Sequence, residues 1–122
     1  MKKRVLLVDD NPDDQMLANE RLMLMGFDVL IAKDGQEGLD LARKESPDVI
    51  LLDLMLPKLD GYKVCRMLKF DKAFEHIPVI IFSAKGSSED KELAQKTGAD
   101  GYMDKPFNPK LFLKTIQELA KI

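Results

Sequence analysis

The sequence of 122 residues lacks several features that mark particular classes of protein. Its single cysteine, Cys65, cannot form an internal disulfide, which favours a helix-core role in the reducing cytoplasm. Its single histidine, His76, has no cysteine or histidine companion for zinc, so a surface role is favoured over catalysis. No Gly-rich phosphate loop is present, and nucleotide binding is therefore unsupported.

Long hydrophobic runs and a strong charge imbalance are also absent. No apolar run approaches the roughly 20 residues of a membrane span, and Asp9 and Asp10 interrupt the apolar start too early for a signal peptide. A net charge of −2 gives no sign of a nucleic-acid binder. With 45% hydrophobic residues, the chain can bury one real core. We therefore expect one cytoplasmic domain, residues 1–122, with no direct contact to nucleic acid or membrane.

Five short apolar runs alternate with five helical patterns. We predict strands at residues 4–9, 27–32, 48–53, 78–83 and 101–103, most of them without the polar alternation of a half-exposed strand. Such runs are typical of strands buried on both faces. Short connections between alternating strands and helices imply right-handed crossovers and a parallel sheet covered by helices on both sides.

The helix starts carry recognisable signals. Asn11 before Pro12, and Asn108 before Pro109, each predict a capping residue followed by a proline in the first turn. Asp34 and Glu37 have the spacing of a capping box. The third helix is expected from about residue 61 to 70, and the fourth from residue 87 or 88 to residue 98. The positions expected to face the core in the first and fifth helices are Ala18, Leu22, Met25, Phe112, Ile116 and Leu119.

Polar side chains end four of the five apolar runs. They are Asp9 and Asp10, Asp53, Ser83, and Lys105 just beyond the last run. The second run contributes no such residue, so we place it at an edge of the sheet. This favours a flavodoxin-like doubly wound (βα)5 sandwich with the strand order 2-1-3-4-5, in which the active cleft lies between strands 1 and 3.

Three carboxylates in one cleft repel one another, and burial raises the free-energy cost of keeping all three charged. A hard cation bound by oxygen ligands, Mg²⁺ or else Mn²⁺, would neutralise Asp9, Asp10 and Asp53. The alternative for Asp10 is a simple helix cap. That alternative leaves the neighbouring acid and the distant Asp53 without explanation.

Asp53 follows the unbroken apolar stretch 49–52. Burying a carboxylate there costs free energy, so we expect this acid to have a function. A carboxylate can attack a phosphoryl group and form an acyl phosphate. Ser83 and Lys105 would then bind phosphoryl oxygens. Taken singly, Ser83 could be a small residue ending a strand and Lys105 a surface lysine before a proline; it is their joint placement that favours the phosphoryl site.

The chain resembles the receiver domain of two-component response regulators, particularly the stand-alone chemotaxis type. The matching segments are VDDNP at 8–12, LLDLMLPKLDG at 51–61, PVIIFSA at 78–84 and GADGYMDKPF at 98–107. The resemblance implies that Asp53 is the phosphoacceptor and that the backbone carbonyl of Met55 joins the three acids around Mg²⁺. It also implies that Ser83 and Lys105 contact the phosphoryl group and that Tyr102 is the aromatic switch. By itself, Tyr102 could equally be an ordinary half-buried strand residue.

The same resemblance implies partners. A sensor histidine kinase or a histidine phosphotransfer protein would supply the phosphoryl group, and an unknown protein target would read the face formed by the fourth helix, fifth strand and fifth helix. The chain would be a monomer or a weak phosphorylation-dependent dimer through that face. It would catalyse only its own phosphorylation and dephosphorylation, and so would not be a turnover enzyme.

Two other functions are compatible with the pattern. One is a Mg²⁺-dependent phosphatase with an aspartyl nucleophile, although Met55 stands where such enzymes usually carry a second acid. The other is a protein-interaction domain that is never phosphorylated. The sequence also leaves open whether residues 1–122 are a complete protein or part of a longer one.

Overall fold

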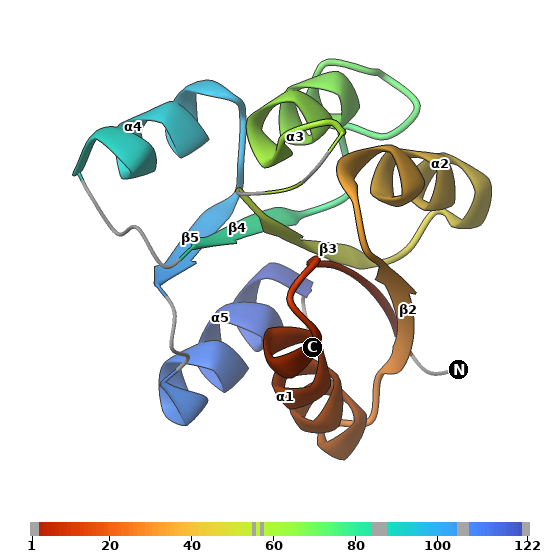
Figure 1. Ribbon diagram of the computed structural model, residues 1–122, viewed down its shortest axis with the longest axis vertical. Helices are drawn as coiled ribbons and strands as arrows, with labels where there is room; N and C mark the ends of the chain where they lie inside the picture. Colours follow the sequence, from red (N-terminus) through yellow and green to blue (C-terminus); the bar gives the residue numbers. More distant parts are fainter. Residues whose placement is uncertain (1–2, 55, 57, 84–87, 105–107, 121–122) are drawn as a thin grey trace.

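A computed structural model describes residues 3–54, 56, 58–83, 88–104 and 108–120. The chain forms a parallel five-stranded sheet between two layers of helices (Figure 1). The strands are β1 (Arg4–Val8), β2 (Asp28–Ala32), β3 (Val49–Asp53), β4 (Val79–Ser83) and β5 (Gly101–Asp104). The helices are α1 (Pro12–Leu24), α2 (Gly35–Glu45), α3 (Gly61–Lys69), α4 (Ser88–Lys96) and α5 (Pro109–Ala120).

The strand order is β2-β1-β3-β4-β5, with every pair parallel. The predicted flavodoxin-like fold and its edge position for the second strand are therefore confirmed. In the part of the chain that the structure describes, no helix is long and apolar enough to cross a membrane.

The core has two halves, one on each face of the sheet. Alternate residues of a strand point to opposite faces, so Ile50 and Leu52 join the half covered by α2, α3 and α4, whereas Val49 and Leu51 join the half covered by α1 and α5. Both β3 and β4 are buried at every residue. This two-sided burial explains why the sequence of these strands shows no polar alternation.

The predicted caps are confirmed at three helices. The Asn11 side chain accepts the backbone N–H groups of Asp13 and Asp14, and Asp34 Oδ1 accepts that of Glu37 at 2.8 Å. At α5, Asn108 Oδ1 accepts the N–H groups of residues 110 and 111. The sequence interpretation missed the cap of α3, where Asp60 Oδ1 accepts the N–H of residue 63 at 3.0 Å.

Several element ends differ from the prediction by a residue or so. Strand β1 ends at Val8 and β2 begins at Asp28, while β5 extends to Asp104. Helix α1 ends with Met25 as its cap, and Gly26 follows at a φ of 92°, a left-handed conformation that suits glycine. These shifts move no predicted residue to another strand or helix.

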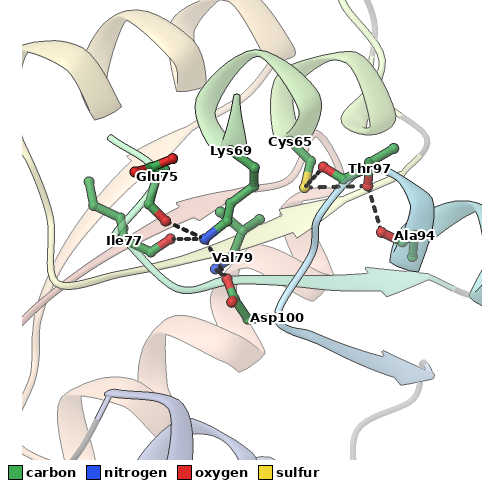
Figure 2. Close-up of polar contacts among 8 residues, drawn as sticks. All are labelled: Cys65, Lys69, Glu75, Ile77, Val79, Ala94, Thr97 and Asp100. Atoms are coloured by element: carbon green, nitrogen blue, oxygen red, sulfur yellow. Dashed lines mark hydrogen bonds and ion pairs between the residues drawn. The ribbon is translucent and has the colours of Figure 1, made fainter. Parts of the chain in front are cut away.

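A polar network joins α3 to the sheet and to the end of α4 (Figure 2). The ammonium of Lys69 donates to the backbone oxygens of Glu75 at 2.6 Å and Ile77 at 3.1 Å, and to Asp100 Oδ2 at 2.9 Å. The same Asp100 oxygen accepts the N–H of Val79 at 2.8 Å.

Cys65 lies beside this network and is buried in the core, as predicted. The hydroxyl of Thr97 donates to the Ala94 backbone oxygen at 2.6 Å, and the Cys65 thiol donates to the Thr97 backbone oxygen at 3.7 Å. Burial raises the pKa of the Cys65 thiol above 9.0, so the thiol stays protonated at neutral pH. The residue therefore has the environment of a packing residue.

Candidate functional site

The register of the central strands brings Asp9 and Asp53 together. Val8 of β1 is the partner of Leu52 in β3, so Asp9, just after β1, comes level with Asp53, the last residue of β3. Both acids continue the alternation that turns Val5, Leu7, Val49 and Leu51 toward the face covered by α1 and α5. The carboxyl edge of the sheet thus holds two acids from strands that are distant in sequence.

Asp10 completes an acidic cluster. One carboxylate oxygen from each of Asp9, Asp10 and Asp53 lies within 4.8 Å of the others. Asp9 is fully buried and Asp53 is 5% exposed, whereas Asp10 is exposed. Three carboxylates at this spacing, two of them shielded from water, offer the hard oxygen donors that Mg²⁺ and Mn²⁺ prefer. The donor set therefore fits a divalent cation.

Two hydrogen bonds from the start of α1 fix the conformation of the turn that carries Asp9 and Asp10. The backbone N–H of Asn11 donates to Asp9 Oδ1 at 3.0 Å, and the Gln15 side-chain amide donates to the Asp9 backbone oxygen. Asn11 is the capping residue of α1. The alternative role of Asp10 as that cap is therefore excluded, and Asp10 remains available as a cation ligand.

Ser83 closes β4 and is fully buried. Its register partner on β5 is Asp104, which precedes the predicted phosphoryl ligand Lys105. Lys105 and Met55 lie outside the described residues.

Tyr102 is half-buried on β5, and its side chain packs against the half of the core that contains Ile81. Ile81 is its register partner on β4, so Tyr102 and Ser83 lie on the same face of the sheet, two residues apart along neighbouring strands. A cavity of about 380 Å³ adjoins the ring, lined by Ala94, Gln95, Ala99, Asp104 and Leu111 among others. Space for movement therefore exists beside the predicted switch residue, between α4, β5 and α5.

Gly61 is a site residue whose structural role sequence reasoning missed. A Cβ on Gly61 would lie 2.2 Å from the backbone oxygen of Asp53, so only glycine permits this approach. The Gly61 N–H also donates to the Leu54 backbone oxygen at 3.2 Å. The sequence signal was the Asp60-Gly61 pair, which marks a helix start but does not reveal the contact with the acceptor strand.

Comparison with known proteins yields one family. The family model described as "Response regulator receiver domain" matches residues 5–117. Among curated proteins, the chain is 44% identical over 110 residues to the alkaline phosphatase synthesis transcriptional regulatory protein PhoP of Bacillus subtilis. That match covers 90% of this chain and 45% of PhoP. The chain spans about half the length of the curated relatives that it matches.

Solved structures give the same fold. The receiver domain of the sensor histidine kinase PA1611 from Pseudomonas aeruginosa has a TM-score of 0.92 and 29% identity over the full length of both chains, and its magnesium ion is coordinated in the active site cleft. The chemotaxis protein CheY4 of Vibrio cholerae has a TM-score of 0.90 and 31% identity, covering 98% of this chain and 99% of CheY4.

The name of PhoP describes a transcriptional regulator, which contrasts with the expected lack of nucleic-acid contact. Because more than half of PhoP lies outside the match, its activity does not transfer to these 122 residues. The absence of direct nucleic-acid contact remains a prediction for this domain.

Proposed function

The chain belongs to the receiver domains of two-component response regulators, and from this premise we propose that residues 1–122 form a signalling switch phosphorylated on Asp53. The observation that carries the proposal is the meeting of Asp9, Asp10 and Asp53 oxygens within 4.8 Å at the carboxyl edge of the sheet. Asp53 is the member of this cluster that ends the central, fully buried strand.

The proposed reaction is a phosphoryl transfer from a phosphohistidine of a kinase or phosphotransfer protein. An oxygen of the Asp53 carboxylate attacks phosphorus, a P–O bond forms, and the P–N bond to the donor histidine breaks. The leaving imidazole nitrogen takes up a proton, and the product on this chain is an acyl phosphate. Hydrolysis later returns Asp53 to a carboxylate and releases inorganic phosphate.

Asp9, Asp10 and Asp53 would hold a Mg²⁺ ion, with the carbonyl of Met55 as a further ligand. When bound, the ion neutralises negative charge among the acids and on the phosphoryl oxygens. We expect the buried hydroxyl of Ser83 to donate to one phosphoryl oxygen and the ammonium of Lys105 to pair with another. Ser83 ends β4, and in the sequence Lys105 follows Asp104, the last residue of the neighbouring β5.

The response would follow from the position of Ser83 and Tyr102 on one face of the sheet. Movement of Ser83 toward the phosphoryl group would leave space into which Tyr102 turns, drawing on the cavity beside it. Such a change shifts the population between two arrangements of the surface of α4, β5 and α5. A protein target, or a second copy in a weak phosphorylation-dependent dimer, would bind the favoured arrangement.

The test is treatment with acetyl phosphate and Mg²⁺, followed by intact-mass measurement and mapping of the modified residue. We expect one phosphoryl group on Asp53, no modification without Mg²⁺, and none on a folded Asp53→Asn variant. Normal acyl-phosphate formation on Asp53→Asn would overturn the assignment. Sustained turnover of small phosphoesters would instead point to a phosphatase.

A further inference from the structure

Helices α1 and α5 lie on the same face of the sheet (Figure 1). Both pack buried side chains into the half of the core on that face. A cavity of about 420 Å³ is lined by residues of these two helices and by the cap of α1, namely Arg21, Leu24, Met25, Lys110, Phe112 and Leu113. Its volume falls in the range of sites that hold small organic molecules. None of these residues belongs to the acidic cluster.

Most of the cavity lining is apolar. Phe112 is buried and Met25 is half-buried, whereas Leu24 and Leu113 are exposed. Exposed leucines beside a cavity gain free energy when an apolar group covers them, because water leaves their surface. The lining therefore favours a ligand with an aliphatic part.

The two polar residues of the lining are both cations. They are Arg21 and Lys110, and among the described residues no acidic side chain lines the cavity. The positions three and four residues away from Arg21 along the helix hold Leu17, Ala18, Leu24 and Met25. Arg21 thus has no carboxylate on its own face of α1. Neither cation has an ion pair within the described part of the chain.

Arg21 has also lost part of its hydration. The residue is half-buried, and within the described structure its Nε is buried without a hydrogen-bond partner. A buried N–H group without a partner is rare and costs free energy. Because Nε lies among protein atoms, only the outer nitrogens of the guanidinium can reach a ligand. A partly dehydrated cation attracts an anion more strongly than a cation in open water does.

We propose that this cavity binds a small organic acid with an aliphatic tail, such as a medium-chain carboxylate. The carboxylate pairs with Arg21 and Lys110, and the planar guanidinium suits its two oxygens. The tail covers Leu24 and Leu113. A neutral aliphatic molecule would leave the two cations without a counter-charge, and an inorganic anion would leave the leucines exposed. The site goes beyond the proposed switch and shares no residue with it.

Octanoate is the probe, compared with acetate, which lacks the tail, and with octanol, which lacks the charge. Titration followed by two-dimensional amide NMR gives the affinity and the location together, at concentrations where octanoate forms no micelles. We expect shifts at residues 21–25 and 110–113 and unchanged signals at residues 49–53. Octanoate should bind roughly tenfold more tightly than either comparison molecule. Added salt should weaken its binding, because salt screens the attraction between charges.

Variants separate the charge from the fold. Arg21→Gln keeps the helix propensity and removes the charge, and we expect the octanoate affinity to fall roughly tenfold. Lys110→Gln, at an exposed position, should lower it roughly two- to threefold. Arg21→Lys should retain more binding than Arg21→Gln. Lys114→Gln is the matched control, since Lys114 is an exposed residue of α5 outside the cavity lining, and it should leave the affinity unchanged.

Four results would contradict the proposal. They are no binding of octanoate, equal affinities for octanoate and octanol, full affinity in a folded Arg21→Gln variant, and shifts that lie away from α1 and α5. Binding to vesicles that contain phosphatidylglycerol, combined with no binding of free octanoate, would assign the surface to a membrane instead. None of these outcomes bears on the phosphorylation of Asp53, so the proposed function and this site are tested separately.

Discussion

Replacing Lys69 with methionine should be among the most damaging single changes outside the hydrophobic core. The ammonium donates to three acceptors from the loop after α3 and the loop before β5 (Figure 2). Methionine retains most of the apolar stem and removes all three hydrogen bonds. The change therefore tests the polar contacts separately from the packing of the side chain.

The partial exposure of the Lys69–Asp100 pair determines how much the free energy of unfolding should fall. The Lys69 side chain is 12% exposed and that of Asp100 is 34% exposed, so this pair is only partly shielded. Asp100 also keeps the Val79 N–H as a donor after the change. Loss of a fully buried pair costs about 3–5 kcal/mol, and a hydrogen bond to a charged group about 1.5–3 kcal/mol. For this partly exposed pair we expect the free energy of unfolding to fall by about 2–3 kcal/mol.

Urea denaturation measures this loss directly, and thermal unfolding gives a second value. With an unfolding entropy of about 2.1 cal/mol/K per residue over 122 residues, the melting temperature should fall by about 8–12 °C. Lys63→Met, at an exposed position of the same helix, should change stability by less than about 0.5 kcal/mol. A loss below about 1 kcal/mol for Lys69→Met would refute the structural importance of the network.

Two substitutions and one labelling experiment test individual contacts. Asn11→Ala should lower the free energy of unfolding by about 1 kcal/mol in urea denaturation, because it removes the cap of α1; an unchanged value would contradict that role. The Glu37 N–H lowers the pKa of Asp34 below 3.8, so Asp34 stabilises the folded state at neutral pH and loses this effect as the pH falls through its folded pKa. The stability difference between wild type and Asp34→Asn should therefore shrink on acidification below pH 3.8, and a difference independent of pH would count against it. Cys65, buried with a raised pKa, should react with a thiol reagent only as fast as the protein unfolds; rapid labelling of the folded protein would show that the thiol is accessible.

The sequence was sufficient to predict the sheet because its signals are local. Buried parallel strands read as apolar runs, and the residue at the end of each run fixes which side chains meet at the carboxyl edge. Asp9 and Asp53 could thus be paired before their register was known. The caps at Asn11, Asp34 and Asn108 were also predictable, because capping uses residues two or three apart.

Contacts between distant segments were not predictable in the same way. Lys69 and Asp100 are 31 residues apart, and neither has a sequence neighbour that indicates its partner. The approach of Gly35 to Leu59 depends on how α2 and α3 pack, which the periodicity of each helix does not determine. Strand ends moved by one residue for a related reason, since the last hydrogen bond depends on the neighbouring strand.

Because alternate side chains point to opposite faces, the sheet also separates the site residues into two groups. Asp9 and Asp53 continue the rows that face α1 and α5, while Ser83 and Tyr102 continue the rows on the opposite side. A ligand bound by the acids could reach the face that carries Tyr102 only around this rim, which is formed by the carboxyl ends of the strands. Ser83 ends β4 at that rim and is fully buried, so a bulkier residue at this position would crowd the place where the two faces of the sheet meet.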